Sequence, residues 1–388
     1  MTNNKDKKVL NVLNLRFPNF FEEWEEHYLS EYLEFKNGLN PNAEKFGRGI
    51  KFISVMDILS NNVITYDCIR ASVEITAEEL KSFIVKNGDI LFQRSSETLE
   101  DVGRANVYMD DKPAVFGGFV IRGKKKSEYN PLFFKYLLAT PYARRKIIPM
   151  GAGAQHFNIG QEGLSKVKLY FPILQEQHKI ASLLQLIDER ISTQNKIIED
   201  LKKLKSAIRK RVFTSLKNEH TENCEINQLL AYEQPSAYIV ANDEYSSDTT
   251  LTPVLTANKG FVLGYTNEDF GIYQKGECII FDDFTMDTKY VSFPFKVKSS
   301  AIKILTAKSN VNLRFMFEYL LYLELKSEEH KRHYISEIAS LVIKLPLKEK
   351  QNRIAYLMTS LDNKLVLEEN IMAKYMDEKR YILSQMFI

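Results

Sequence analysis

The sequence predicts an α/β protein made of two mixed α/β domains and two long helices that pair as a coiled coil. Two observations carry this prediction. The segment 172–213 recurs without a gap at 346–387, an offset of 174 residues, and each copy follows a strand-rich segment. A long-period internal repeat decides the architecture before any local pattern does. We expect the first domain over 1–173, the first long helix over 174–217, the second domain over 218–346 and the second long helix over 347–388.

The repeat rests on identical residues that keep one register. A gapless match of about forty positions is hard to produce by composition alone. The matched pairs are Pro172 with Pro346, Gln177 with Gln351, Ile180 with Ile354, Ala181 with Ala355, Leu183 with Leu357, Asp188 with Asp362, Ile197 with Ile371, Lys205 with Lys379 and Phe213 with Phe387. The chain is therefore interpreted as a tandem duplication.

Each copy has the apolar spacing of a coiled-coil helix. Apolar residues step by four and three, as a heptad seam requires. A helix of about forty residues is roughly 60 Å long, because the rise is 1.5 Å per residue. The expected helix-pairing residues are Ile180, Leu184, Ile187, Ile191, Ile198 and Leu201 in the first copy, and Ile354, Met358, Leu361, Leu365, Met372 and Tyr375 in the second.

Both seams are interrupted at the same places, by Gln194 and Glu368 and then by Lys205 and Lys379. Polar seam residues lower stability but fix register and partner. The apolar stripe is buried either if each helix packs on its own domain or if the two helices pack on each other. The slot-for-slot match of the seams favours the second arrangement.

Composition places the chain among soluble globular proteins. At 388 residues there is room for two or three domains, each with its own core. The 53 basic and 50 acidic side chains nearly cancel, so any basic face must be local. There is no bilayer-length apolar run and no signal-peptide pattern, and the three cysteines have no CxxC spacing. We expect a cytoplasmic protein without membrane contact.

The first domain is expected to begin with a docking turn at 15–18 and a short helix around Trp24. Alternating and β-branched residues then predict strands over 51–59, 61–69, 87–96, 104–109 and 114–123, with a helical piece at 75–85. One helix is predicted over 132–146, followed by a glycine-bearing loop at 151–160 and a last strand at 167–172.

The second domain repeats this plan with different residues. The segment 223–233 resembles a shortened start of the first domain, with Cys224 standing roughly where Trp24 stood. Strands are predicted over 237–242, 252–257, 260–265, 277–284 and 290–305, and a helix over 314–325. Outside the two long helices the halves share hardly any sequence. Two similar helices thus carry two dissimilar domains.

This contrast predicts a target with two unlike parts at a fixed spacing. A DNA duplex provides such a target, because proteins with two-fold geometry read half-sites about 34 Å apart. A helix of roughly 60 Å can hold two domains at that separation.

Known catalytic motifs are missing from the sequence. There is no phosphate-binding GxxxxGK[ST] loop and no dinucleotide GxGxxG, and Asn130-Pro131-Leu132 lacks the second proline of an amino-methyltransferase tetrapeptide. Asp282 and Asp283 are adjacent on a predicted strand and so point to opposite faces. The histidines His27, His156, His178, His220, His330 and His333 have no metal-ligand spacing. We expect no catalytic residue, no metal and no cofactor.

The candidates for DNA contact are basic, amide and hydroxyl side chains on loops beside strands. Lysine and arginine neutralise phosphate, while arginine, glutamine, serine and threonine can read base edges. They are Gln93, Arg94, Ser95, Ser96, Arg104, Arg122, Lys124, Gln155 and His156 in the first domain, and Tyr245, Ser246, Thr285, Lys289, Lys296, Lys298, Ser299 and Ser300 in the second.

The repeated motif resembles the specificity subunit of type I restriction-modification systems, the HsdS family. The residues that carry the resemblance include Trp24 and Leu29, the run that begins at Gly88, and the helix motif Pro172, Glu176, Gln177, Ile180, Ala181, Leu184, Asp188, Arg190 and Ile191 with its second copy from Pro346. The resemblance covers essentially the whole chain. The second copy departs from the first at Lys350, where the first has Glu176.

The resemblance implies a fold and a role. The two long helices would lie antiparallel between two target recognition domains, in a pseudo-two-fold arrangement. The subunit would bind a bipartite target in double-stranded DNA and perform no chemistry itself. Two methyltransferase subunits and the restriction and translocase subunits would be its partners, with docking that is unequal at Glu176 and Lys350.

Two other functions stay open at this stage. A coiled-coil scaffold could use both domains to bind other proteins, although such a scaffold does not need two divergent domains. An enzyme with an unrecognised nuclease or methylase site is the second alternative, and methyl transfer by the lone chain would support it.

Overall fold

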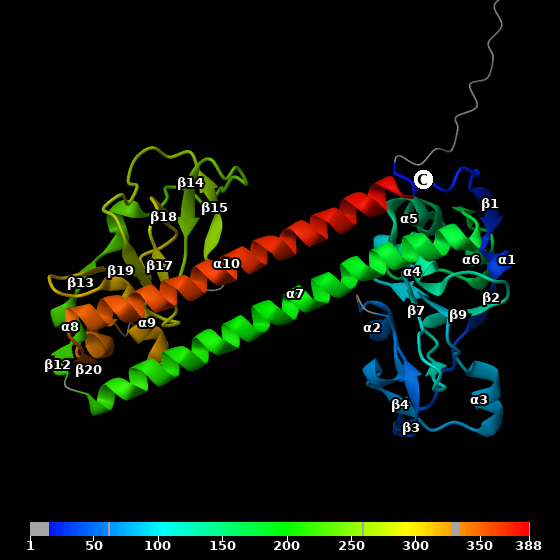
Figure 1. Cartoon of the computed structure of the whole chain (residues 1–388), viewed down its shortest axis with the longest axis horizontal. Coiled ribbons are helices and arrows are strands. Elements are labelled where there is room, and N and C mark those ends of the chain that lie inside the picture. The colour runs from blue at the N-terminus through cyan, green and yellow to red at the C-terminus, as the bar shows by residue number, and fades with distance from the viewer. Residues whose placement is uncertain (1–14, 61–62, 220, 258–259, 327–333, 388) are drawn as a thin grey trace, which may run out of the picture. The chain divides into compact units, whose positions relative to one another are not determined.

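The computed structural model describes residues 15–60, 63–219, 221–257, 260–326 and 334–387. They form two compact units. The residues up to Gln194 form one unit together with those from Ile371 onward, and Asn195–Asn370 forms the other. Each unit contains one globular head and one half of each long helix, α7 (Leu174–Ser215) and α10 (Lys348–Gln385), both continuous helices (Figure 1).

The first head has two main sheets and two short strand pairs, β1 with β11 and β6 with β10. The larger is antiparallel with the order β2-β9-β5-β7, and the smaller has the order β4-β3-β8, with β8 parallel to β3. The strands are β1 (Glu25–Tyr28), β2 (Leu33–Asn37), β3 (Phe46–Ile53), β4 (Ser72–Val73), β5 (Ile90–Gln93), β6 (Ser95–Ser96), β7 (Ala105–Val107), β8 (Val115–Phe116), β9 (Val120–Lys125), β10 (Phe157–Asn158) and β11 (Lys168–Phe171). The helices are α1 (Leu29–Tyr32), α2 (Val55–Ile58), α3 (Ala77–Phe83), α4 (Pro131–Ala139), α5 (Pro141–Ile147) and α6 (Gln161–Ser165).

The second head has the same topology. Its larger sheet has the order β13-β19-β16-β17 and its smaller sheet β15-β14-β18, with β18 parallel to β14. The strands are β12 (Glu222–Glu225), β13 (Leu230–Glu233), β14 (Thr252–Leu255), β15 (Val262–Thr266), β16 (Cys278–Asp282), β17 (Thr288–Val291), β18 (Lys296–Val297), β19 (Ile302–Ala307) and β20 (Val342–Leu345), and the short helices are α8 (Ile226–Leu229) and α9 (Leu313–Tyr322). The duplication has therefore kept the fold of the heads while their sequences diverged.

Four local predictions in the first head are wrong. The short helix expected around Trp24 is absent, because Trp24 leads into strand β1 and the one-turn helix α1 begins only at Leu29. The strand predicted over 51–59 stops at Ile53, because Ser54 and Asp57 form a capping box that starts α2. The described part of 61–69 holds a 3-10 turn (Tyr66–Cys68) instead of a strand. The helix predicted over 132–146 is two helices, since Thr140 caps a new start and accepts a hydrogen bond from the Ala143 backbone. Pro141 in the first turn of α5 lacks the N–H that would continue α4.

Each head has a short pair of antiparallel strands. The register of these two pairs corrects one alignment that the sequence predicted. β1 pairs with β11, and β12 pairs with β20. His27 lies opposite Leu169, and Cys224 lies opposite Ile343, which is the repeat partner of Leu169. Cys224 therefore takes the place of His27 and not that of Trp24. Trp24 has a different role: its ring contacts Phe133 and Phe387.

The two long helices pack antiparallel within each unit. In the second unit Lys202 of α7 pairs with Glu369 of α10, and Lys205 pairs with Asp362. In the first unit Lys379 of α10 pairs with Asp188 of α7 at 2.5 Å. Lys379 and Asp362 each lie 174 residues after Lys205 and Asp188. Two repeat-related ion pairs thus hold the same antiparallel register, one in each unit.

The sequence left open whether each apolar seam packs on a head or on the other long helix, and both kinds of packing occur. The predicted residues Ile180, Leu184, Ile187, Ile198, Ile354, Met358 and Leu365 are buried, and Ile191, Leu201, Leu361, Met372 and Tyr375 are half-buried. The starts of both helices pack into a head core, where α7 meets the end of α10 through Ile382 and Met386. Each helix therefore packs on a head and on the other helix.

The junction between helix and head is repeated almost atom for atom. Asn130 caps α4 and Asn312 caps α9, each through its side-chain oxygen. The backbone N–H groups of these two residues donate to the side chains of Gln177 and Gln351 at 3.0 and 2.9 Å. Buried Gln177 and Gln351 in turn donate to the carbonyls of Pro172 and Pro346. Two identical residues of the repeat, the proline and the glutamine, therefore fasten each head to its helix.

The one reversal of charge at the helix starts, Glu176 against Lys350, is compensated locally. Fully buried Glu176 accepts two hydrogen bonds from Arg16, at 2.8 and 2.7 Å. Lys350, its repeat partner, forms an ion pair with Glu219. Each ion pair thus connects the start of a long helix to a residue at the beginning of a head. The helix supplies the acidic partner in the first pair and the basic partner in the second.

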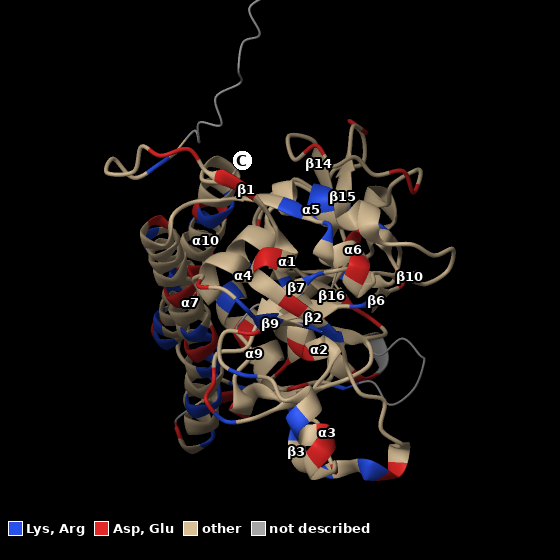
Figure 2. Ribbon diagram, turned by 90° about the vertical axis from the view of Figure 1, so that its right-hand side faces the viewer, with Lys and Arg blue, Asp and Glu red and all other residues tan. Residues whose placement is uncertain are grey.

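The surfaces of the long helices are charged with both signs. Acidic and basic residues are interspersed along the exposed faces of α7 and α10 (Figure 2). Across the described residues no helix is long and apolar enough to span a membrane.

Candidate nucleic-acid interface

One edge of the first head gathers several of the predicted contact residues. Arg94 follows β5, and Ser95 and Ser96 form β6, which pairs with β10. The Arg94 backbone N–H donates to the carbonyl of Phe119 at 2.8 Å, and its guanidinium donates to the carbonyl of Gly118 at 3.2 Å. The end of β5, the β6–β10 pair and the turn between β8 and β9 therefore lie together. We call this surface the first edge.

Phe119 is the most exposed apolar side chain of the first edge, at 68%. It follows Gly117 and Gly118, and neither position has room for a side chain. A Cβ on Gly118 would lie 1.8 Å from the Asn40 side chain, and one on Gly117 would lie 2.6 Å from the Phe52 ring. The two glycines of this turn therefore pack closely against Asn40 and Phe52, and the turn holds the Phe119 side chain toward solvent. The sequence did not single out this residue, although a large aromatic after two glycines in a strand-to-strand turn was a usable signal.

The other candidates of the first head are dispersed. Gln155 and His156 are exposed in the loop that leads into β10, so they border the first edge. Arg104 is exposed at the start of β7 and pairs with Asp101 at 2.6 Å. Lys124 is exposed farther along β9 and lies 3.8 Å from Glu34.

Three predicted contact residues are buried. Gln93 is 5% exposed and donates to the Ser95 carbonyl. Arg122 is 6% exposed, stacks over Phe116 and has its pKa lowered by burial. Lys296 is fully buried against Glu268 at 2.7 Å and over the Phe270 ring. Alternation along a strand did not reveal that these side chains face a protein core, and burial keeps them from DNA.

The equivalent edge of the second head is built from two turns. Asp283, after β16, donates its backbone N–H to the Ala301 carbonyl in the turn between β18 and β19. This turn exposes Lys298 and Ser299, with Ser300 half-exposed. The neighbouring turn between β16 and β17 exposes Thr285. We call this surface the second edge.

Other predicted residues of the second head lie beside these turns or apart from them. Lys289 is half-exposed on β17. Ser246 is exposed and bridges Tyr265 of β15. The Tyr245 hydroxyl donates to Asp243 at 3.1 Å, and burial together with this bond raises the pKa of Tyr245.

The two edges have equivalent backbones and unlike side chains. Gln93 lies opposite Val120 in the first head, and Asp282 lies opposite Ile302 in the second. This register places Arg94 at the position of Asp283, and Phe119 at that of Ala301. Asp283 is buried, where it pairs with Lys303 at 3.4 Å and accepts the Tyr334 N–H. The first edge therefore presents arginine and phenylalanine, and the second presents lysine and serine.

The adjacent aspartates Asp282 and Asp283 have structural partners. Asp282 accepts the backbone N–H groups of Phe284 and Thr285, both at 2.9 Å, and so shapes the turn after β16. Among the described residues there is no group of three or more histidine, cysteine or acidic side chains placed to hold a metal ion. His220, His330 and His333 lie outside the described residues.

Comparison with known proteins gives consistent matches. The family model of the type I restriction modification DNA specificity domain matches twice, over residues 21–203 and 218–374. The chain is 44% identical over 127 residues to the specificity subunit of the type I restriction enzyme EcoR124I/EcoR124II of Escherichia coli, a match that spans 31% of each chain. It is 25% identical to the putative type I restriction enzyme MjaX specificity subunit of Methanocaldococcus jannaschii, over 94% of this chain and 92% of that one.

Solved structures show the same fold. The S subunit of a type I restriction-modification system from M. genitalium superposes with a TM-score of 0.62 at 15% identity, over 97% of this chain and 99% of that one. A second structure, from work on complex assembly and conformational transition of the type I system, has a TM-score of 0.57 at 12% identity and covers 96% and 99% of the two chains. Two family-model matches that together cover most of the sequence, one on each head and its helix, show that the chain belongs to the type I restriction-modification specificity subunit family.

Proposed function

We propose that this chain binds a bipartite target in double-stranded DNA, one half-site with each head, and that it carries no catalytic site of its own. The observation that supports this most directly is the pair of edges. Two heads of one topology hold equivalent turns with different side chains, Arg94 and Phe119 in one and Lys298 and Ser299 in the other. A protein that recognises two unlike DNA half-sites needs different side chains on its two heads, whereas a symmetric scaffold for other proteins does not.

The first edge combines a cation with an exposed aromatic ring. Among the described residues Arg94 forms no ion pair with a carboxylate, and its guanidinium donates to the Gly118 carbonyl. The guanidinium has further donors that can bind phosphate or a guanine edge. An exposed aromatic ring can stack on a base or wedge into a base step. We therefore assign Arg94, Ser95, Ser96 and Phe119, bordered by Gln155 and His156, to the first half-site.

The second edge offers a smaller polar set. Lys298 supplies the positive charge for phosphate, and the hydroxyls of Ser299, Ser300 and Thr285 can donate or accept at base edges. Among the predicted residues, Arg104, Lys124, Tyr245, Ser246 and Lys289 stay candidates for backbone contact. Gln93, Arg122 and Lys296 are not included, because they are buried.

The long helices are the proposed docking surface for the methyltransferase subunits, in two copies, and for the restriction and translocase subunits. In the second unit α10 exposes Tyr356 at 77% and Leu367 at 52%, where α7 has Ser182 and Thr193 at the repeat positions. Glu176 and Lys350 are engaged with Arg16 and Glu219. Unequal docking of the two methyltransferases is therefore assigned to these exposed apolar residues and not to the difference at Glu176 and Lys350.

The experiment that tests the function is methylome sequencing of the source cell and of a strain that lacks this gene. We expect a bipartite adenine motif that disappears with the gene and returns when the full chain is supplied. An unchanged methylation pattern would count against the proposal, and so would methyl transfer by the purified chain alone. Capture of proteins by both heads, without specific DNA binding, would favour the scaffold.

A further inference from the structure

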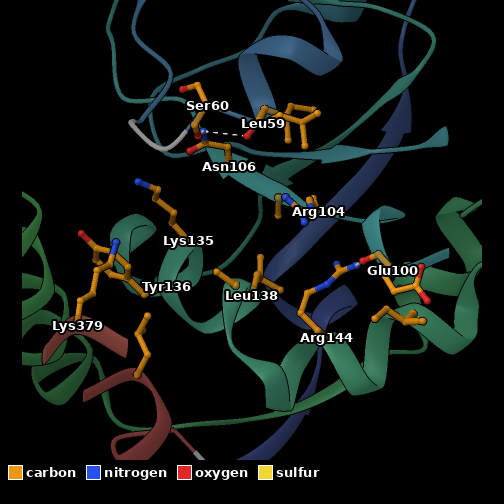
Figure 3. Close-up of a pocket in the computed structure, with 15 residues that line it drawn as sticks. Leu59, Ser60, Glu100, Arg104, Asn106, Lys135, Tyr136, Leu138, Arg144 and Lys379 are labelled. Carbon is orange, nitrogen blue, oxygen red and sulfur yellow. Dashed lines mark hydrogen bonds between the residues drawn. The ribbon is translucent and has the colours of Figure 1, made fainter. Parts of the chain in front are cut away.

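A pocket of about 410 Å³ lies in the first unit. Its lining comes from the segment after α2, from β7, from α4 and α5, and from the end of α10 (Figure 3). Small-molecule sites commonly have volumes of about 300–1,000 Å³. The pocket is therefore large enough to hold a small ligand or one group of a larger one.

The polar lining is mainly basic. Lys135 comes from α4, Arg144 from α5, Arg104 from the start of β7, and Lys379 from α10. Among the described residues that line the pocket, Glu100 is the acidic one. Its backbone carbonyl accepts a hydrogen bond from Arg144 at 2.8 Å, and its carboxylate lies on the far side of Arg144 from Lys135 (Figure 3).

The four cations fall into two pairs whose members influence each other electrostatically. The ammonium groups of Lys135 and Lys379 both lie 5.6 Å from the centre of the Tyr136 ring. Asp188 serves this pair: it binds Lys379 at 2.5 Å and accepts the Tyr136 hydroxyl at 2.9 Å. Arg104 and Arg144 make the second pair, where Asp101 binds Arg104 at 2.6 Å. Among the described residues the four cations thus lie near three carboxylates, those of Asp188, Asp101 and Glu100.

Repulsion and burial both act on these cations. Burial, and to a smaller extent Arg104, lower the pKa of Arg144 to about 10, while burial and the neighbouring Lys379 lower that of Lys135. The Arg144 guanidinium donates to the carbonyls of Glu100 and Val102, and its Nη1 is buried without a hydrogen-bond partner in the described residues. An anion in the pocket would relieve the repulsion and supply acceptors.

We infer that this pocket binds a phosphate group between Lys135 and Lys379 on one side and Arg104 and Arg144 on the other. Phosphate matches the excess of positive charge and has oxygens for several donors at once, which suits arginine especially. The group is either a backbone phosphodiester of bound DNA or a free phosphate. The DNA source rests on the proposed function, and the free phosphate does not.

The test uses the full-length chain and two double variants. Lys135→Gln with Arg104→Gln removes one cation from each pair of the pocket and spares Arg144, which holds two backbone carbonyls. Arg145→Gln with Lys146→Gln is the matched control, because it removes two exposed cations from α5, outside the pocket lining. Circular dichroism checks that both variants are folded.

The first arm measures inorganic phosphate by ³¹P NMR titration and by thermal unfolding, against chloride at equal ionic strength. We expect phosphate to raise the Tm of the wild type and the control, and to shift the Tm of the pocket variant much less. The second arm measures duplex binding as a function of salt. We expect the slope of log affinity against log salt to fall by about 0.9 for each DNA phosphate that the pocket variant no longer neutralises, and to change less in the control.

The two arms separate the outcomes. A change in salt slope without phosphate binding identifies the DNA backbone as the source, and phosphate binding with an unchanged slope identifies a free phosphate. The inference is overturned if the pocket variant matches the wild type in both arms. If the wild-type chain binds no specific duplex, the proposed function fails while the phosphate arm still decides the pocket.

Discussion

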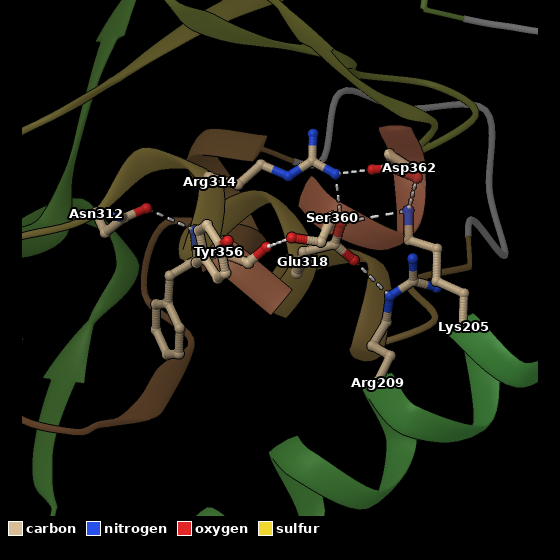
Figure 4. A network of polar contacts seen from close by, with 9 residues as sticks. Lys205, Arg209, Asn312, Arg314, Glu318, Tyr356, Ser360 and Asp362 are labelled. Carbon is tan, nitrogen blue, oxygen red and sulfur yellow. Dashed lines mark hydrogen bonds and ion pairs between the residues drawn. The ribbon is translucent and has the colours of Figure 1, made fainter. Parts of the chain in front are cut away.

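At the scale of single residues, one position beside the long helices differs in chemistry between the two heads. Glu318 and Tyr136 each lie six residues after the asparagine that caps their helix. Fully buried Glu318 accepts hydrogen bonds from Arg209 and Arg314, both at 2.8 Å, and lies 3.5 Å from Lys205 (Figure 4). Asp362 is the second carboxylate of this cluster. At this position the second junction therefore has a buried carboxylate surrounded by cations, whereas the first junction has the tyrosine Tyr136.

Replacement of Glu318 tests this cluster. Glu318→Gln keeps the shape of the side chain but leaves three cations with Asp362 alone, so we expect a decrease of about 3 kcal/mol in stability. Tyr136→Phe is the control in the first head, where removal of one hydrogen bond to Asp188 costs about 1 kcal/mol. Urea unfolding measures both variants. A decrease no larger for Glu318→Gln than for Tyr136→Phe would contradict the assignment.

A second residue pair predicts a dependence on pH. Lys296 forms an ion pair with Glu268 at 2.7 Å, and this contact lowers the pKa of Glu268. A carboxyl whose folded pKa lies below its unfolded value, about 4.3, stabilises the fold above that pH. This contribution disappears as the pH falls through the folded pKa.

Glu268→Gln should therefore destabilise the second head by about 3 kcal/mol at neutral pH, because buried Lys296 loses its charged partner. We expect the difference from the wild type to shrink as the pH falls below about 4.3. Thermal unfolding at a series of pH values measures it, with exposed Glu244→Gln as control. A difference that stays constant with pH would show that the ion pair does not supply the stability.

At the scale of elements, the charged residues in and beside the seams specify the register more narrowly than the apolar ones do. Apolar seam residues fit any shift by one heptad, whereas an ion pair fits one alignment. Lys379 and Asp188 are 27% and 28% exposed, and Lys202 and Glu369 are 58% and 48% exposed. The less exposed pair is less screened by solvent and should contribute more to stability.

Single lysine replacements compare the two pairs. We expect Lys379→Met to cost about 1 kcal/mol and Lys202→Met to cost less than about 0.5 kcal/mol, since both keep the aliphatic part of the side chain. Urea unfolding of the full chain at low and high salt measures the difference. Equal costs for both variants would mean that exposure does not decide the strength of these pairs.

At the scale of the whole molecule, the duplication gives two units with the same plan and separate cores. Because the proposed contacts lie in different units and share no residue, changes in the two edges should act independently. Each edge should influence the reading of one half-site only.

Variants of the two edges test this independence. We expect Phe119→Ala to weaken discrimination at one half-site without a change in salt slope, because an apolar contact neutralises no phosphate. Lys298→Gln should instead lower the salt slope and leave the discrimination at that half-site intact. Duplexes with one or the other half-site scrambled measure both effects. Weaker reading of both half-sites by either variant would contradict separate reading.

The sequence alone determined the duplication, the long helices and the strand-rich heads. These features are periodic, and periodicity is visible without coordinates. It also picked Arg94, Ser95, Ser96, Lys298 and Ser299, which lie at exposed or half-exposed edges because short polar runs after strands usually mark turns.

Only the tertiary structure decided which polar side chains are available. Arg122 and Lys296 have the same local pattern as exposed basic residues, but each faces a core and is held there by a distant partner, the Ile84 carbonyl or Glu268. The same is true of the pocket, whose four cations come from segments as far apart as Arg104 and Lys379. Burial and charge clustering depend on contacts between residues remote in sequence, and no local pattern records them.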